Sequence, residues 1–203
     1  HGDRDLPWRR AGDGWAVLVA AMLLRKTTTS QVVKVYGEFL RRYPTPAALV
    51  SASVEELREL LKPLGIENQR AQLFKRLAEK LAELGGVPCD RGALKRLPGV
   101  GDYAASEVLL VACGRPEPLL DRNMARVLQR VFGVRPSKSR PHTDPEMWAL
   151  ARSLVPQDPE LAKEFNFGVL DLARKICTAR KPKCGECPLR GVCKYAQNQS
   201  GRD

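Results

Sequence analysis

The sequence lacks the features of several common protein classes. Its longest apolar run, residues 15–24, is shorter than the roughly 20 residues that a helix needs to cross a bilayer. No charged segment followed by an apolar core and a cleavage site opens the chain, which predicts an intracellular protein. No segment alternates convincingly as a strand, and there is neither an internal repeat nor a low-complexity linker.

Acidic residues are in the minority. The 203 residues include 34 Lys and Arg against 23 Asp and Glu, a formal net charge of +11. The hydrophobic fraction of 43% and the charged fraction of 28% are those of an ordinary globular protein with a sizeable core. The basic excess favours a polyanionic partner, nucleic acid before membrane, because basic side chains displace counterions from phosphates.

The chain is patterned as helices joined by short loops. Ser53 stands three residues before Glu56 and opens an apolar stripe, as in a capping box. Asp144-Pro145 and Asp158-Pro159 each pair a capping residue with a proline suited to the first helical position. Residues 15–24 are apolar throughout, which indicates a helix buried on all sides. The sequence therefore predicts an all-α protein.

Six cysteines are distributed unevenly. Four of them lie near the C-terminus in the pattern Cys-x6-Cys-x2-Cys-x5-Cys, whereas the other two are distant in sequence. This asymmetry favours a metal centre over three disulfides. A zinc ion is one general candidate for such a centre. Cys89 and Cys113 are expected to be small buried side chains rather than ligands. The candidate ligands are Cys177, Cys184, Cys187 and Cys193.

A glycine-flanked turn separates two helical patterns, residues 91–96 and 103–111. It reads Leu97-Pro98-Gly99-Val100-Gly101. Glycines let the backbone turn tightly and approach a ligand, and the N-terminus of the following helix attracts phosphate. The turn therefore predicts a phosphate contact through Gly99, Val100 and Gly101, although a plain connection between two helices is the alternative.

This hairpin, followed twenty residues later by Asp121, resembles the helix-hairpin-helix base-excision DNA glycosylases. That superfamily includes endonuclease III, the adenine glycosylases and the archaeal thymine/uracil mismatch glycosylases. The similarity covers nearly the whole chain, including Leu6-Pro7-Trp8 and Phe165-Asn166. The cysteine spacing is similar to the [4Fe–4S] loop of endonuclease III, and iron–sulfur clusters use thiolate ligands.

The resemblance implies roles for individual residues. Asp121 matches the catalytic aspartate, whose carboxylate would stabilise positive charge on the sugar. Without the family match, the position of Asp121 just before a helical pattern predicts a helix N-cap. Arg180, Lys181 and Lys183 inside the cysteine loop are expected to follow a DNA backbone. Lys26 aligns with a residue that fills the gap left by an extruded base, whereas without the alignment it indicates a solvated helix end.

Further DNA contacts follow from the alignment. Ile66 aligns with the family's wedge residue, a side chain that enters the duplex where the base has left. Without the alignment, Ile66 would be expected to contact the core. Arg25 is a candidate for the orphan guanine, for a phosphate or for solvent.

Two positions separate the reactions within the superfamily. Endonuclease III has a lysine where this chain has Tyr103, and a phenol cannot form the Schiff base that leads to strand cleavage. Adenine glycosylases have a glutamate where this chain has Ala21, and their extra domain for 8-oxoguanine has no room after Cys193. Thymine mismatch enzymes share the tyrosine, but they too keep an acidic residue at the Ala21 position.

The sequence thus predicts a monofunctional glycosylase that removes thymine or uracil mispaired with guanine and acts as a monomer on double-stranded DNA. The alternatives are removal of adenine or of another base within the same family, and catalytically silent binding of distorted DNA. Two helical lobes are expected: residues 11–116, with the hairpin at about 94–111, and residues 1–10 joined to 117–203 around the cluster. DNA is expected to bind between the lobes.

Overall fold

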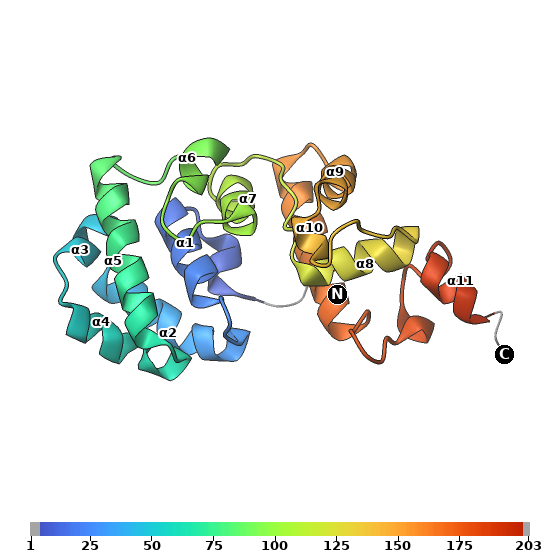
Figure 1. Cartoon of the computed structure of the whole chain (residues 1–203), viewed down its shortest axis with the longest axis horizontal. Coiled ribbons are helices and arrows are strands. Elements are labelled where there is room, and N and C mark those ends of the chain that lie inside the picture. The colour runs from blue at the N-terminus through green and yellow to red at the C-terminus, as the bar shows by residue number, and fades with distance from the viewer. Residues whose placement is uncertain (1–4, 201–203) are drawn as a thin grey trace. The chain divides into compact units, whose positions relative to one another are not determined.

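The computed structural model describes residues 5–200, except for the side chain of Ser200, and these residues form helices without strands. None of the described helices is long and apolar enough to cross a membrane. Two compact units divide the chain, Asp5–Arg115 and the residues from Pro116 onward. The helices of the first unit are α1 (Gly14–Leu23), α2 (Thr29–Arg42), α3 (Pro46–Val50), α4 (Val54–Leu61), α5 (Glu67–Glu83), α6 (Arg91–Lys95) and α7 (Asp102–Val111), with single 3₁₀ turns at Pro7–Arg10 and Lys62–Leu64 (Figure 1).

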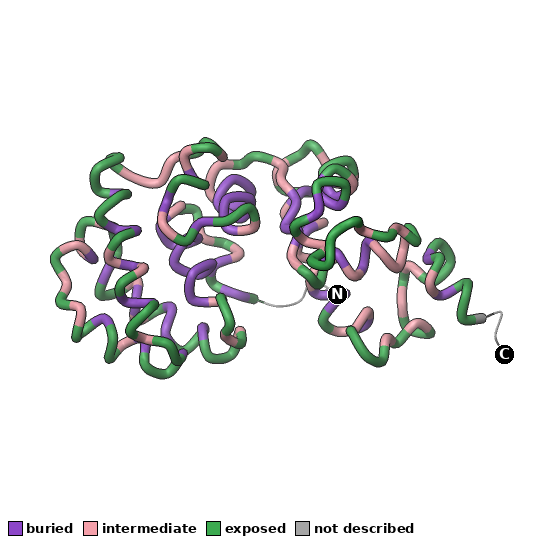
Figure 2. The backbone as a smooth tube through the Cα atoms, viewed as in Figure 1, coloured by how far each residue is buried: buried purple, intermediate pink, exposed green. Residues whose placement is uncertain are grey.

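The core of the first unit is built around α1. Every residue of this helix from Trp15 to Leu23 is buried, as its uninterrupted apolar run predicts (Figure 2). Helices α2 and α7 pack against it. Phe39 contacts Phe74 with ring centroids 4.8 Å apart, which joins α2 to α5. The apolar stripe of α5 ends at Gly85 and Gly86, both with positive φ angles, so the glycines stop the helix.

The second unit contains α8 (Arg122–Phe132), α9 (Pro145–Leu154), α10 (Pro159–Lys175) and α11 (Lys194–Ser200), with 3₁₀ turns at Pro141–Thr143 and Cys184–Glu186. Helix α8 is strongly amphipathic. One side packs Met124 and Leu128 against Met147 and Trp148 of α9, and the other packs Val127 against the end of α10. Helix α8 is therefore the central element of this unit.

Sequence signals for helix starts are confirmed. Ser53 accepts a hydrogen bond from the backbone N–H of Glu56 at 3.1 Å. Asp144 and Asp158 cap α9 and α10, and each is followed by proline at the first helical position. The side chains of all three residues accept hydrogen bonds from backbone N–H groups of the first turn, which have no partner within the helix.

Residues 5–10 differ from the expected lobe assignment. They were predicted to join residues 117–203, but they belong to the first unit. The reason is packing: Trp8 is buried and meets Tyr36 of α2 edge to face, with ring centroids 5.4 Å apart. Residues 1–4 of the same predicted segment lie outside the described residues.

The expectation that Cys89 and Cys113 are small buried side chains was wrong. Cys89 is exposed and forms a disulfide with the half-buried Cys113. Cys89 precedes α6 and Cys113 follows α7, so the reversal of the chain between these helices brings their outer ends together, with the two Cα atoms 5.8 Å apart. The bond closes a loop that contains the whole glycine turn.

Breaking this disulfide should destabilise the first unit. In the unfolded chain a closed loop of this length removes conformational freedom worth about 3 kcal/mol. We expect Cys89→Ser to lower the free energy of unfolding by about that amount, measured by chemical denaturation without reductant. Cys113→Ser should have the same effect, and reductant should bring the wild type to the level of the variants. Equal stability of oxidised wild type and both variants would contradict the disulfide.

Candidate functional site

The predicted glycine turn connects α6 to α7. Gly99 has a φ angle of +77°, and a Cβ atom there would lie 2.9 Å from a methyl carbon of Leu73. The backbone conformation therefore favours glycine, and the side chain of Leu73 from α5 lies close against it. The backbone N–H of Val100 donates to the carbonyl of Leu97 at 3.1 Å, which closes the turn, and Val100 itself is buried.

Helix α7 begins directly after the turn. Gly101 is its N-cap and supplies no side chain, and the first helical bond runs from the N–H of Ala105 to the carbonyl of Gly101. Asp102 holds the two hairpin helices together, because its carboxylate lies 2.7 Å from Nζ of Lys95. Tyr103 is half-buried in the first turn of α7. Gly101 and the positive end of the helix dipole thus lie at the surface beside Tyr103.

The loop after α1 touches the same turn. Arg25 donates from Nη1 to the carbonyl of Gly99 at 3.2 Å. Lys26 is exposed, and so is Ile66, which is the N-cap of α5. Ile66 keeps 48% of its surface accessible, so the interpretation as a core contact is wrong.

Asp121 is the N-cap of α8, as its spacing predicts. Its Oδ1 accepts hydrogen bonds from the backbone N–H groups of Asn123 at 2.8 Å and Met124 at 2.7 Å. Its Oδ2 accepts from the side-chain amide of Asn123 at 2.7 Å. The half-buried carboxylate is therefore held in one orientation, with both oxygens engaged.

The segment that leads to Asp121 is fixed by a residue that the sequence did not single out for this role. Asn166, buried in α10, accepts from the N–H of Leu119 at 2.6 Å. Its amide donates to the carbonyls of Glu117 at 3.0 Å and Ala162 at 2.8 Å. One buried side chain thus satisfies three backbone groups, and it positions the residues just before Asp121.

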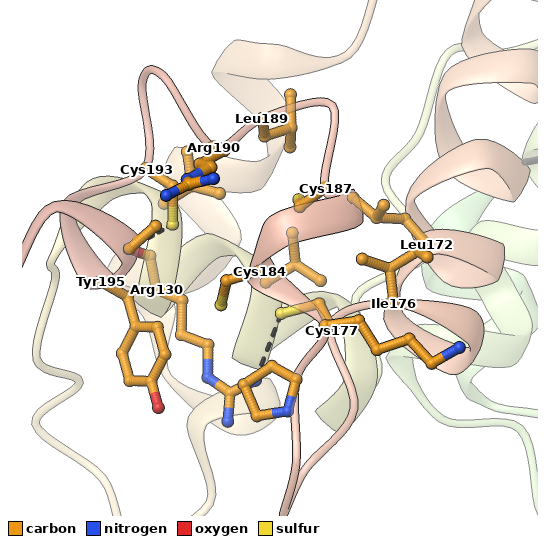
Figure 3. A pocket seen from close by; sticks show the side chains of 15 residues that line it. Arg130, Leu172, Ile176, Cys177, Cys184, Cys187, Leu189, Arg190, Cys193 and Tyr195 are labelled. Atoms are coloured by element: carbon orange, nitrogen blue, oxygen red, sulfur yellow. Dashed lines mark hydrogen bonds between the residues drawn. The ribbon is translucent and has the colours of Figure 1, made fainter. Parts of the chain in front are cut away.

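The four C-terminal cysteines line one pocket of the second unit (Figure 3). None of them is in a disulfide. Burial raises the pKa of the Cys184 thiol, and the other three cysteines of the pocket raise it further. Apolar side chains, Tyr195 and the basic residues Arg130, Lys183 and Arg190 complete the lining, without histidine or carboxylate.

This donor set fits an iron–sulfur cluster, because such clusters bind through thiolates and the surrounding cations offset their negative charge. Among residues 5–200, no group of three or more His, Cys, Asp or Glu side chains is positioned to hold a metal ion.

Two arginines of α8 bind the cysteine loop. Arg126 donates to the carbonyl of Cys177 at 2.8 Å and to that of Ala173 at 2.9 Å. Arg130 lies 3.3 Å from Sγ of Cys177, donates to the carbonyl of Thr178 at 2.7 Å, and stacks on the ring of Tyr195 (Figure 3). The helix that begins at Asp121 therefore ends in contact with the cysteine pocket.

The predicted basic loop lies between Cys177 and Cys184. Arg180, Lys181 and Lys183 are all exposed. The loop folds back on itself, because the hydroxyl of Thr178 donates to the carbonyl of Lys181 at 2.6 Å and the N–H of Lys183 donates to the carbonyl of Ile176 at 2.9 Å. Nζ of Lys183 lies 3.7 Å from Oε2 of Glu186, so this charge is partly balanced. The loop as a whole still presents positive charge to solvent.

Comparison with known proteins identifies the family. Residues 19–153 match the HhH-GPD superfamily base excision DNA repair protein model. The chain belongs to the HhH-GPD superfamily. Residues 177–193 of this HhH-GPD protein also match the iron–sulfur binding domain of endonuclease III, which covers all four cysteines of the pocket.

Individual relatives agree with this assignment. The HhH-GPD protein is 67% identical over 98% of its length to the thymine/uracil-DNA glycosylase of Pyrobaculum aerophilum, covering 87% of that relative. It is 33% identical to the human adenine DNA glycosylase, over 96% of its own length and 37% of the human protein. A solved structure of a thermostable thymine-DNA glycosylase superposes with a TM-score of 0.90 at 35% identity, over 96% of this chain and 89% of that one.

The sequence alone did not point to Arg126 or Arg130, or to the structural role of Asn166. The two arginines follow the predicted N-cap at Asp121 by five and nine residues, so they lie on one face of α8. The sequence predicts that the two arginines share a helix face, but it does not show that this face packs against the cysteine loop.

Loss of Arg130 should loosen the iron–sulfur centre. Residues that hold metal ligands in place typically contribute about 10-fold to 100-fold to metal affinity. We expect Arg130→Met to lose iron at least about tenfold faster than wild type in the presence of a chelator, measured as iron and sulfide per chain over time. Arg174→Met, which removes an exposed arginine of α10, is the matched control. Equal loss rates in all three proteins would contradict the role of Arg130.

Proposed function

We propose that this HhH-GPD protein is a monofunctional DNA glycosylase that hydrolyses the N-glycosidic bond of thymine or uracil mispaired with guanine. The observation that carries the proposal is a carboxylate fixed at Asp121, in a chain with tyrosine rather than an amine at residue 103. The thymine/uracil-DNA glycosylase of P. aerophilum and the thermostable thymine-DNA glycosylase support the substrate class.

Asp121 supplies the chemistry in this mechanism. When the glycosidic bond breaks, its electron pair leaves with the base and positive charge develops on the sugar. A carboxylate held beside the sugar stabilises that charge. A water molecule then bonds to the anomeric carbon, and its proton ends on the departed base anion. The hydrogen bonds from Asn123 and Met124 orient the carboxylate before the substrate arrives.

Ala21 makes adenine a poorer substrate for this chain. It is a buried residue of α1 and offers no proton to a departing base. Adenine is a poor leaving group without protonation, whereas thymine and uracil leave as anions stabilised by hydrogen bonds and depend less on a general acid. We therefore favour pyrimidine over adenine.

The DNA contacts follow from the hairpin and the neighbouring loops. We propose that the turn from Gly99 to Gly101 and the N-terminus of α7 bind backbone phosphates, while Arg25, Lys26 and Ile66 meet the mispaired site. The basic cysteine loop, with Arg180, Lys181 and Lys183, would bind the DNA backbone in a salt-dependent manner. The protein is proposed to act as a monomer.

We also propose that Cys177, Cys184, Cys187 and Cys193 hold a [4Fe–4S] cluster, supported by their spacing and by their shared pocket. When bound, the cluster would cross-link the loop and hold its basic residues in place. Base hydrolysis transfers no electrons, so the cluster contributes binding and stability rather than a redox step.

The proposed function is tested by base release from end-labelled duplexes containing thymine·guanine, uracil·guanine or adenine·8-oxoguanine, each with and without alkali. We expect alkali-dependent cutting at thymine or uracil. Asp121→Asn should lower the rate of base release at least about a hundredfold, because the charge opposite the sugar is lost, while DNA binding persists. Cutting at adenine alone, or full activity of the variant, would overturn the assignment.

Tyr103→Lys should add strand cleavage to base removal. An amine at this position would attack the sugar and form a Schiff base that borohydride traps as a covalent protein–DNA adduct. We expect trapping for the variant but not for wild type. Tyr103→Met is the control, because it lacks the amine. Absence of an adduct with the lysine variant would mean that residue 103 does not face the sugar.

A further inference from the structure

Two exposed residues of the first unit have a left-handed backbone. Lys26 has a φ angle of 56° and Ile66 one of 49°, and they are the non-glycine residues with positive φ within the described chain. For isoleucine this conformation is a clear outlier, because its side chain branches at Cβ. Such residues persist only where the surrounding structure holds them, and they gather at functional sites.

A single buried side chain holds both of these residues. Arg70 of α5 is only 5% exposed. Its Nε donates to the carbonyl of Gly65 at 3.1 Å, and its Nη1 donates to the carbonyls of Met22 and Leu23, both at 3.0 Å. Its Nη2 donates to Thr27 Oγ1 at 2.6 Å and to the carbonyl of Arg25. All five N–H groups of the guanidinium are therefore used.

The contacts of Arg70 flank each strained residue. Arg25 and Thr27, the neighbours of Lys26, both accept from its Nη2. Gly65 accepts from its Nε, and the carbonyl of Ile66 accepts from its backbone N–H at 3.0 Å. The guanidinium also caps the C-terminus of α1, which has no basic residue in its own last turn.

The same face of α5 also touches the glycine turn. Leu73, three residues after Arg70, lies against Gly99 so closely that a Cβ atom there would be 2.9 Å from it. Arg25, whose carbonyl Arg70 holds, reaches the carbonyl of Gly99 with its own side chain. The two exposed loops and the turn are thus fixed to one helix.

We propose that Arg70 is a positioning residue for base extrusion: it holds Lys26 and Ile66 outward, in strained conformations, ready to enter the duplex at the mispair. This inference rests on the proposed function. Unstacking a base costs a few kcal/mol, and side chains that occupy the gap offset this cost. Side chains that are already ordered lose less conformational entropy on insertion.

The same helix offers a matched control. Lys75 donates from Nζ to the carbonyls of Leu49 at 3.2 Å, Val50 at 2.6 Å and Ala52 at 2.8 Å. It thus caps the C-terminus of α3 with a cation, as Arg70 caps that of α1. Its partners are not next to either strained residue, so Lys75→Met should reproduce the loss of stability without the loss of positioning.

The first measurement is hydrogen–deuterium exchange of the proteins without DNA. We compare Arg70→Lys, Arg70→Met and Lys75→Met with wild type. Lysine keeps the charge but has three donors instead of five and no planar fork, so both Arg70 variants should speed exchange in residues 24–28 and 64–68. Lys75→Met should speed exchange in residues 49–53 instead. If Arg70→Met does not fold, Arg70→Lys still provides the comparison.

The second measurement is single-turnover base release at saturating protein from two duplexes. In one duplex uracil is opposite guanine; in the other it is opposite an abasic-site analogue, where no pair must be broken. Relative to wild type, the Arg70 variants should lose about tenfold to a hundredfold on uracil·guanine and much less on the second duplex. Lys75→Met should change both rates equally.

The outcomes separate the two claims. Equal losses on both duplexes for the Arg70 variants, or unchanged exchange in the two loops, would overturn the positioning role. A wild-type protein that releases uracil from neither duplex would overturn the uracil activity of the proposed function, while the exchange data would still test whether Arg70 fixes both loops.

Discussion

Helix termini need hydrogen-bond partners that the helix itself does not supply, and four residues of the candidate site lie at such termini. Lys26 follows the C-terminus of α1, Ile66 is the N-cap of α5, Tyr103 lies in the first turn of α7, and Asp121 caps α8. Backbone groups at such ends are satisfied by side chains or ligands. The first unit uses Arg70 for this purpose at α1, whereas the uncapped start of α7 suits a phosphate.

Arginine connects the elements of each unit because it carries five donors in a planar fork. In the second unit, Arg126 and Arg130 bind the loop that contains Cys177, and the same helix begins at Asp121. In the first unit, Arg70 binds two loops and α1. Part of the basic excess is therefore used inside the protein, where it satisfies carbonyl groups, and only the exposed remainder is available to DNA.

Local signals in the sequence predicted much of this structure. The caps at Ser53, Asp144 and Asp158 and the buried helix around residues 15–24 depend on neighbouring residues alone, so they were readable without a tertiary model. The cysteine spacing likewise predicted one shared pocket. The disulfide between Cys89 and Cys113 was missed, because it depends on how α6 and α7 bring their outer ends together rather than on spacing.

The sequence by itself determined the helical architecture, the glycine turn, the N-cap at Asp121 and the all-cysteine donor set, because each is set by residue type within a few positions along the chain. Only the tertiary structure decided the rest. It showed that Ile66 is exposed in a left-handed conformation and that Arg70 reaches five acceptors between Met22 and Gly65. Those facts depend on which helices pack together, and packing is a property of the whole buried surface that no local pattern contains.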